Sequence, residues 1–163
     1  MFSRLLIKLA PGPVKHPLIA CTRWYWDTRQ LPEQSSQDMR VLKDLLMSVR
    51  SGVLRVWEWG AGKRTIYYPK FLISKGRKFE WHAVDNSTAW YEKCQKDLSG
   101  TQLEDRVHLY CREFPAFWQL PSYSTSNPVP PQSWNENQTV AEYIKLPTKI
   151  GVEFDVMIID GRY

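Results

Sequence analysis

The sequence LRVWEWGAG, residues 54–62, decides the fold. Its first six residues are rich in Val and Trp and are typical of a buried strand. Gly60 and Gly62 follow directly, with only Ala61 between them. Two glycines allow the backbone to turn sharply and let a ligand approach it closely, which a Cβ would prevent. The stretch therefore predicts a strand, a tight turn and a first candidate binding element.

Segments on both sides of this stretch alternate between helical and extended patterns. Ser35 and Asp38 have capping-box spacing and begin a helix, and Gly52 stands where a C-terminal cap belongs. Its apolar stripe consists of Leu42, Leu45, Leu46 and Val49. The sequence predicts further helices over residues 67–75, 87–98 and 140–145, and strands over residues 54–59, 79–85, 107–111 and 154–159.

Three details of the later helices follow from local chemistry. Pro69 is tolerated if it lies in the first turn of its helix, where a missing N–H does least harm. Gly76 ends that helix, and Asn86 or Ser87 caps the next one. The apolar face of the latter contains Trp90, Tyr91, Cys94 and Leu98.

The alternation of strand and helix predicts an α/β fold, a Rossmann-like parallel sheet with flanking helices. Ligands of such sheets bind outside the carboxyl ends of the strands, where the strand order reverses. The informative residues are therefore those at the strand ends. They are Glu58 to Gly62, Asp85 to Ser87, Arg112 and Glu113, and Asp160 to Arg162.

Composition indicates one main globular domain of a soluble protein. The chain has 163 residues, 43% of them hydrophobic and 13% aromatic, which excludes disorder throughout. No apolar run reaches the roughly 18 residues of a membrane span. We expect a domain over residues 35–163, with a proline-rich loop at 115–137, after an irregular basic segment at 1–34.

Charge and cysteine usage limit the partners and the compartment. The net charge is +5, and Asp27 is the only acidic residue before position 30. A solubilising basic arm is favoured there over a membrane or nucleic-acid contact. The three cysteines, Cys21, Cys94 and Cys111, match neither a disulfide framework nor a zinc site. We expect a reducing compartment, the cytoplasm, and no metal.

The glycine turn does not fit the diphosphate-binding fingerprints. A dinucleotide fingerprint requires a third glycine at position 65, where this chain has Thr65. A phosphate-binding loop requires glycine at the position of Trp57 and Ser or Thr at the position of Arg64. As an alternative to ligand binding, any tight turn between a strand and a helix can use Gly-x-Gly.

Asp85 adds a second signal, since it lies about 20 residues beyond the glycine turn at the tip of the next strand. A carboxylate there can accept hydrogen bonds from both hydroxyls of a ribose. The alternative is a solvent-exposed aspartate that caps the following helix. The glycine turn and the acidic tip together favour ribose binding.

Three segments carry a family resemblance. Glu58-x-Gly60-x-Gly62, the Val84-Asp85 tip and the closing segment 154–162, FDVMIIDGR, resemble the first, second and fourth strand motifs of class I S-adenosylmethionine-dependent methyltransferases. The resemblance covers about residues 40 to 163, and the order and spacing of the motifs are its main support. Lys63 and Arg64 depart from it, because relatives often carry small or hydroxyl residues there.

The resemblance implies S-adenosyl-L-methionine as the cofactor. Gly60, Ala61 and Gly62 would pass beneath its methionine part, and Glu58 would orient that loop. Asp85 would hold the ribose. Residues that follow strand 107–111, beginning with Arg112, would flank the adenine, and Asn86 is a further strand-end candidate. The acceptor expected by analogy is a small-molecule or sugar hydroxyl.

The chemistry requires proximity, an in-line approach and a base if the acceptor is a hydroxyl. Asp160 is the candidate for that base or for a contact with the cofactor amino group, and the alternative is a turn residue before Gly161. None of the three histidines is expected to be catalytic.

The family's sheet has about seven strands in the order 3-2-1-4-5-7-6, whereas this chain presents about four. We therefore expect a truncated form that is itself inactive, with a partner or a missing C-terminal segment covering the fourth strand. The alternative is a complete, non-catalytic α/β module that binds a nucleotide or nucleic acid. Nucleic acid is the less favoured ligand, and its motivation is the basic and aromatic cluster Arg23, Trp24, Tyr25 and Trp26.

Overall fold

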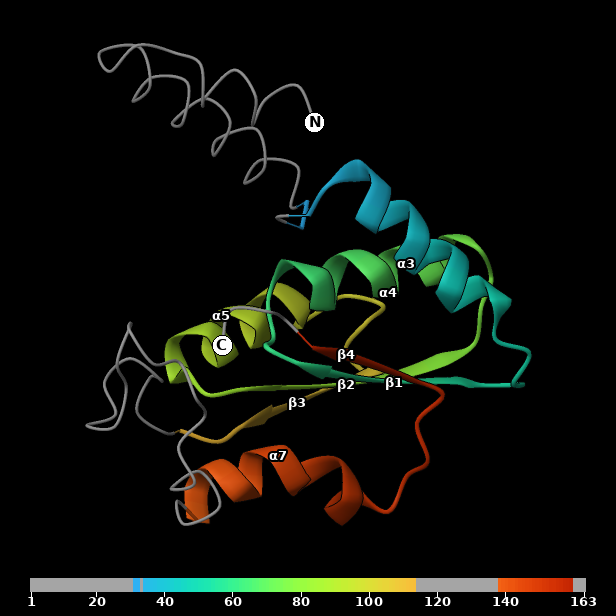
Figure 1. Ribbon diagram of the computed structural model, residues 1–163. Coiled ribbons are helices and arrows are strands. Elements are labelled where there is room, and N and C mark those ends of the chain that lie inside the picture. The colour runs from blue at the N-terminus through green and yellow to red at the C-terminus, as the bar shows by residue number, and fades with distance from the viewer. Residues whose placement is uncertain (1–30, 33, 114–137, 160–163) are drawn as a thin grey trace, which may run out of the picture.

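The computed structural model describes residues 31–32, 34–113 and 138–159, which form a sheet flanked by helices (Figure 1). Its elements are, in chain order, α3 (Ser36–Ser48), β1 (Leu54–Trp59), α4 (Lys63–Ser74), β2 (Phe79–Asp85), α5 (Thr88–Leu98), β3 (Val107–Cys111), α7 (Gln138–Ile150) and β4 (Val156–Ile159). Within these residues the sheet has four strands in the order β3-β2-β1-β4, and every pairing is parallel. The prediction of an α/β, Rossmann-like parallel sheet is confirmed.

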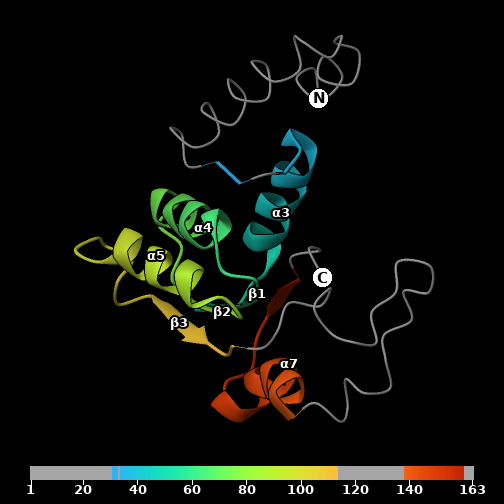
Figure 2. The ribbon, with the colours of Figure 1, turned by 90° about the vertical axis from the view of Figure 1, so that its left-hand side faces the viewer.

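The helices lie on both faces of the sheet. Helices α3, α4 and α5 lie on one face and α7 lies on the other, as two views at right angles show (Figures 1 and 2). The central strands β1 and β2 are therefore buried on both sides, and all of their residues except Arg55, Trp59 and Glu80 are buried. Strands β1, β2 and β3 begin and end where the sequence predicts.

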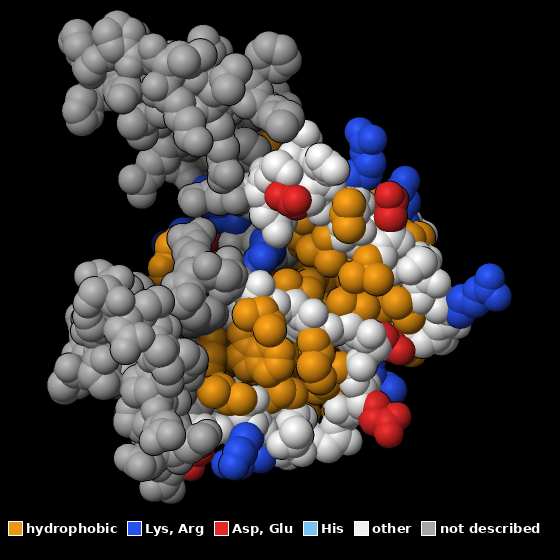
Figure 3. Space-filling view, in the orientation of Figure 1, with side chains coloured by type: hydrophobic (Ala, Val, Ile, Leu, Met, Phe, Trp, Pro, Cys, Tyr) orange, Lys and Arg blue, Asp and Glu red, His pale blue; other side chains and the backbone are white. Residues whose placement is uncertain are grey.

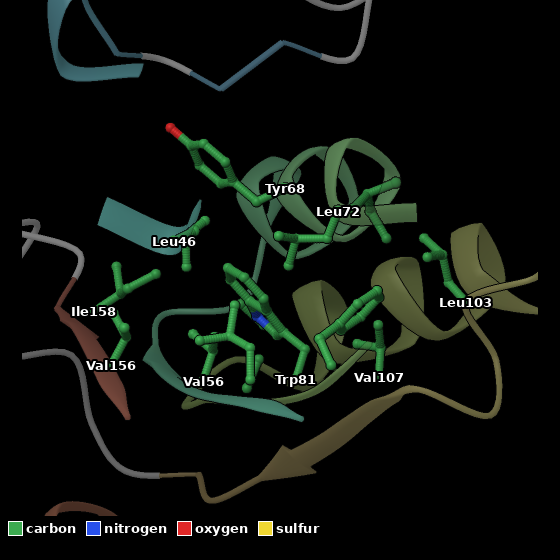
Figure 4. Packing of buried hydrophobic residues seen from close by; sticks show 14 of the residues in the cluster. Leu46, Val56, Tyr68, Leu72, Trp81, Leu103, Val107, Val156 and Ile158 are labelled. Carbon is green, nitrogen blue, oxygen red and sulfur yellow. The ribbon is translucent and has the colours of Figure 1, made fainter. Parts of the chain in front are cut away.

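The main core lies between the sheet and helices α3, α4 and α5. Trp81 and Val56 of the sheet pack there with Tyr68 and Leu72 of α4 and with Leu46 of α3 (Figure 4). All five side chains are fully buried, and burial of each aliphatic one stabilises the fold by about 1.5–3 kcal/mol. A smaller cluster on the opposite face joins Trp57 and Val84 to Tyr143 and Leu146 of α7.

Helix α3 confirms the predicted start but not the predicted end. Ser35 Oγ accepts a hydrogen bond from the Asp38 amide, and the Asp38 carboxylate accepts one from the Ser35 amide, which completes the capping box. The helix ends at Ser48 with Val49 as its C-cap, so the assignment of Gly52 as the cap is wrong. Leu45 is 46% exposed, because only the side of the helix that carries Leu46 faces the core.

Helix α4 begins earlier than predicted, at Lys63 rather than Tyr67. Pro69 consequently lies inside the helix and not in its first turn. The early start is stabilised at Gly62, whose amide donates to Thr65 Oγ1 over 2.9 Å. Burial of Ile66, Tyr68 and Leu72 on the same helix offsets the missing N–H of the proline.

The end of α4 is as predicted. Gly76 has φ +66°, a conformation that glycine adopts without strain, and its amide donates to the Ile73 carbonyl over 2.9 Å. Helix α5 begins after Ser87, one of the two caps that the sequence suggested. Cys94 and Leu98 form its buried side, whereas Trp90 is 42% exposed, so its assignment to the buried face is wrong.

The last two elements differ from their predicted bounds. Helix α7 extends from Gln138 to Ile150, well beyond the short segment 140–145, and contains Pro147. Strand β4 begins at Val156 rather than Phe154, because Asp155 is engaged at its start: the Asp155 carboxylate accepts a hydrogen bond from the Arg55 amide over 2.8 Å. The basic segment 1–30, the loop 115–137 and Asp160 lie outside the described residues.

None of the helices that the structure describes combines the length and the apolar character needed to cross a bilayer.

Candidate functional site

The candidate site begins at the turn that connects β1 to α4. Gly60 has φ +89°, a backbone conformation that L-residues with a side chain rarely adopt. Its amide donates to the Val84 carbonyl over 2.8 Å, which ties the turn to the end of β2. Ala61 is buried in the main core, so its side chain anchors the turn from below. The backbone conformation thus explains the glycine at position 60.

Gly62 is a glycine that the folded chain itself does not require. Its φ of 177° is extended backbone that any residue adopts. A Cβ built on Gly62 would meet no atom within 4 Å, so the space beside the turn is open. An open space next to a backbone of this kind suits a ligand that passes directly over the turn.

Glu58 lies beneath the turn on the α4 face of the sheet, and its side chain is completely buried. Its Oε2 accepts hydrogen bonds from Thr65 Oγ1 over 2.8 Å and from Trp81 Nε1 over 2.9 Å. The Arg64 guanidinium lies 3.3 Å from Oε1 through its Nε, and the Arg64 side chain is only 11% exposed. A buried carboxylate is costly unless it is paired and hydrogen-bonded, and these partners meet that requirement.

Asp85 lies at the tip of β2 and is 6% exposed. Its Oδ1 accepts a hydrogen bond from the Ser87 amide over 2.7 Å, and its carbonyl accepts one from the Arg112 amide over 3.0 Å. The N-cap of α5 is Ser87, whose Oγ accepts from the Trp90 amide. Asp85 is therefore a buried strand-end carboxylate rather than an exposed cap.

The sheet register brings these positions to one edge. Trp59 pairs with Val84, and Asp85 pairs with Cys111, so Gly60, Asn86 and Arg112 all follow the carboxyl ends of neighbouring strands. Asn86 is partly buried, and Arg112 is exposed with its Nη1 donating to the Cys111 carbonyl over 2.8 Å. Asp160 would follow Ile159, which pairs with Trp59, but the structure does not describe it.

Sequence reasoning missed two side chains that shape this edge. Thr65 and Trp81 both donate to Glu58, and both are fully buried. The signal for Thr65 was its presence where a dinucleotide fingerprint has glycine. No local signal marks Trp81, because its indole reaches Glu58 from another strand.

A further polar contact at the same edge escaped prediction. Thr88 Oγ1 at the start of α5 donates to the Glu113 carboxylate, just after β3. The same hydroxyl lies 3.7 Å from Cys111 Sγ. These groups link the start of α5 to the carboxyl end of β3.

His82 lies away from this edge, in the middle of β2 on the α7 face. Its ring is 4.6 Å from that of His108, and its Nδ1 is 3.0 Å from the Tyr110 hydroxyl. Burial, reinforced by the neighbouring His108, lowers the pKa of His82 to about 4, so it is neutral at pH 7. Within the described residues, no three His, Cys, Asp or Glu side chains converge as metal ligands.

The strand order reverses between β1 and β4, so the glycine turn lies at the switch point of the sheet, where α/β proteins bind their ligands. No model of a known protein family matches the sequence, and no curated protein sequence is significantly similar to it. The function is therefore inferred from the fold and from the chemistry of the site itself.

Proposed function

We propose that this protein binds S-adenosyl-L-methionine at the carboxyl edge of its sheet and takes part in methyl transfer to a small-molecule or sugar hydroxyl. One observation carries the proposal: the open glycine turn after β1, which lies at the switch point, adjoins the end of β2 that carries the buried carboxylate of Asp85. Open space beside the turn allows a ligand to pass close to the protein backbone. A carboxylate at a strand tip can accept hydrogen bonds from the hydroxyls of a ribose.

The residues present suit the parts of such a cofactor. Gly60 and Gly62 would face the methionine part, with Glu58 holding the turn from below. Asp85 would accept hydrogen bonds from the ribose hydroxyls, and Asn86 and Arg112 would lie beside the adenosine. When bound, the cofactor supplies a methyl group already activated by its sulfonium. The protein then contributes proximity and orientation, and Asp160 is the proposed base.

The site is tested by calorimetry with S-adenosylhomocysteine. We expect the full chain to bind it, and Asp85→Ala to weaken binding by about 1–3 kcal/mol, the cost of leaving buried polar groups unpaired. The matched control is Asp97→Ala, which removes the partner of Lys93 in a surface ion pair on α5 and leaves affinity unchanged. Equal affinity of the Asp85 variant and the wild type would contradict the ribose assignment.

Two further measurements separate this function from its rival. Tighter binding of a nucleotide such as ATP than of S-adenosylhomocysteine would favour a non-catalytic nucleotide-binding module. Release of S-adenosylhomocysteine in the presence of a panel of hydroxyl acceptors tests methyl transfer itself.

The proposed compartment is the cytoplasm. The thiols of Cys94 and Cys111 are not joined in a disulfide, which is usual under reducing conditions. Burial raises the pKa of the Cys94 thiol to about 12, so it stays protonated and packs as a small apolar side chain.

A further inference from the structure

Thr65 occupies the position where a dinucleotide fingerprint has its third glycine, and its side chain is completely buried in the first turn of α4. The hydroxyl acts in two directions. It donates to Glu58 Oε2 over 2.8 Å and accepts from the Gly62 amide over 2.9 Å. Only a hydroxyl has both capacities on one atom at this side-chain length.

The carboxylate to which Thr65 donates is also contacted by one side chain of another strand and by one of the same helix. Trp81 Nε1 on β2 donates to the same Oε2, and Arg64 on α4 approaches Oε1. Glu58 belongs to β1, so its position is defined by two strands and a helix before the chain reaches the turn. Three side chains thus converge on one fully buried carboxylate, which fixes its position.

We propose that Thr65 is the positioning residue of the cofactor site: it transmits the fixed position of the Glu58 carboxylate to the Gly62 amide and so sets the backbone of the glycine turn. This inference rests on the proposed function for the identity of the ligand. Thr65 touches no ligand itself, because it lies beneath the turn. At the position of the third glycine of a dinucleotide fingerprint, this chain has a hydroxyl that links the turn to the sheet.

The chain offers a matched control for a purely structural role. Thr101, in the connection between α5 and β3, also uses its hydroxyl in two directions: it donates to the Leu98 carbonyl over 2.6 Å and accepts from the Leu103 amide over 3.2 Å. This connection precedes β3 and so lies at the opposite edge of the sheet. Thr101→Val therefore removes a similar pair of bonds without touching the site.

The experiment compares Thr65→Val, Thr65→Ser and Thr101→Val with the wild type. Valine preserves the shape of threonine and removes the hydroxyl, whereas serine retains it. We expect Thr65→Val to bind S-adenosylhomocysteine about tenfold more weakly or worse by calorimetry. Thr65→Ser and Thr101→Val should bind within about twofold of the wild type, although Thr101→Val also loses stability.

Amide hydrogen exchange gives a readout that needs no ligand. The Gly62 amide of the wild type should be protected although it lies at the start of a helix, and Thr65→Val should increase its exchange about tenfold. An unprotected Gly62 amide in the wild type overturns the inference, even if the valine variant fails to fold. Unchanged affinity of a folded Thr65→Val variant overturns it as well.

The two levels of the proposal fail differently. If the wild type does not bind S-adenosylhomocysteine, the proposed cofactor is wrong, while the exchange of the Gly62 amide still decides whether Thr65 holds the turn. If the wild type binds and the valine variant binds equally well, the cofactor site stands and Thr65 is only structural.

Discussion

The two glycines of the turn have different reasons for being glycine. Gly60 has a positive φ, so a side chain there strains the backbone whether or not a ligand is bound. Gly62 has extended backbone and open space where its Cβ would lie. Substitutions at these two positions therefore separate the stability of the fold from ligand binding.

We expect Gly60→Ala to lower the free energy of unfolding by about 1–2 kcal/mol, the cost of a left-handed L-residue. Gly62→Ala should change it by less than about 1 kcal/mol, because a weaker N-cap is offset by a less flexible unfolded chain. The added methyl group should nevertheless weaken binding of S-adenosylhomocysteine. Denaturant unfolding and calorimetry on both variants check this, and unchanged affinity of Gly62→Ala would show that no ligand passes over the turn.

Strand β4, at the edge of the described sheet, exposes two large apolar side chains. Val156 and Ile158 are buried in the main core, whereas Met157 is 57% exposed and Ile159 is 68% exposed. Within residues 34–113 and 138–159, β4 pairs only with β1. Figure 3 shows apolar side chains gathered on this side of the molecule, around α3 and the edge of the sheet. Such edges promote pairing between copies of a chain.

We expect Met157→Lys to reduce concentration-dependent self-association, since a lysine on an edge strand opposes strand pairing. Static light scattering over a concentration series measures the effect. The matched control is Ile144→Lys in α7, which replaces an apolar residue of similar exposure, 48%, on a helix without an unpaired edge. Equal effects of the two substitutions would show that general hydrophobicity, and not the edge of β4, drives association.

The stability of the entire domain should depend on pH through His82. Its pKa in the folded protein is about 4, below the ordinary value of about 6.5. The unfolded chain therefore takes up a proton first as the pH falls, and protonation favours unfolding. Neutral His82 therefore makes its full contribution to the free energy of unfolding above about pH 6.5, and this contribution is lost progressively between about pH 6.5 and pH 4.

This shift predicts a loss on the order of 3 kcal/mol of unfolding free energy over that range, relative to a chain without the group. The measurement is denaturant unfolding of the wild type and of His82→Gln at several pH values. Subtracting the two free energies of unfolding at each pH removes the contribution of the carboxylates, which both proteins share. His108→Gln should keep most of the dependence, because burial is the larger cause of the lowered pKa. Parallel curves for the wild type and His82→Gln would contradict the prediction.

Patterns along the chain were sufficient for the bounds of the first three strands and for placing the candidate site residues at the carboxyl ends of the strands. Strands β1, β2 and β3 have their predicted bounds because each is a short segment rich in β-branched or aromatic residues, and their parallel order follows from the intervening helices. The same patterns placed Gly60, Asp85 and Arg112 at the carboxyl ends of neighbouring strands, since all parallel strands end at one edge. The roles of these residues in cofactor binding stay predictions.

Tertiary contacts decided the features that no local pattern contains. Helix α4 includes Pro69 because burial of the helix outweighs one missing hydrogen bond, and Leu45 is exposed because only the side of α3 that carries Leu46 faces the core. The anchor at Glu58 depends on Trp81, which is distant in sequence and adjacent only through strand pairing. Propensity and periodicity describe each segment by itself, whereas burial and side-chain hydrogen bonds depend on which segments meet.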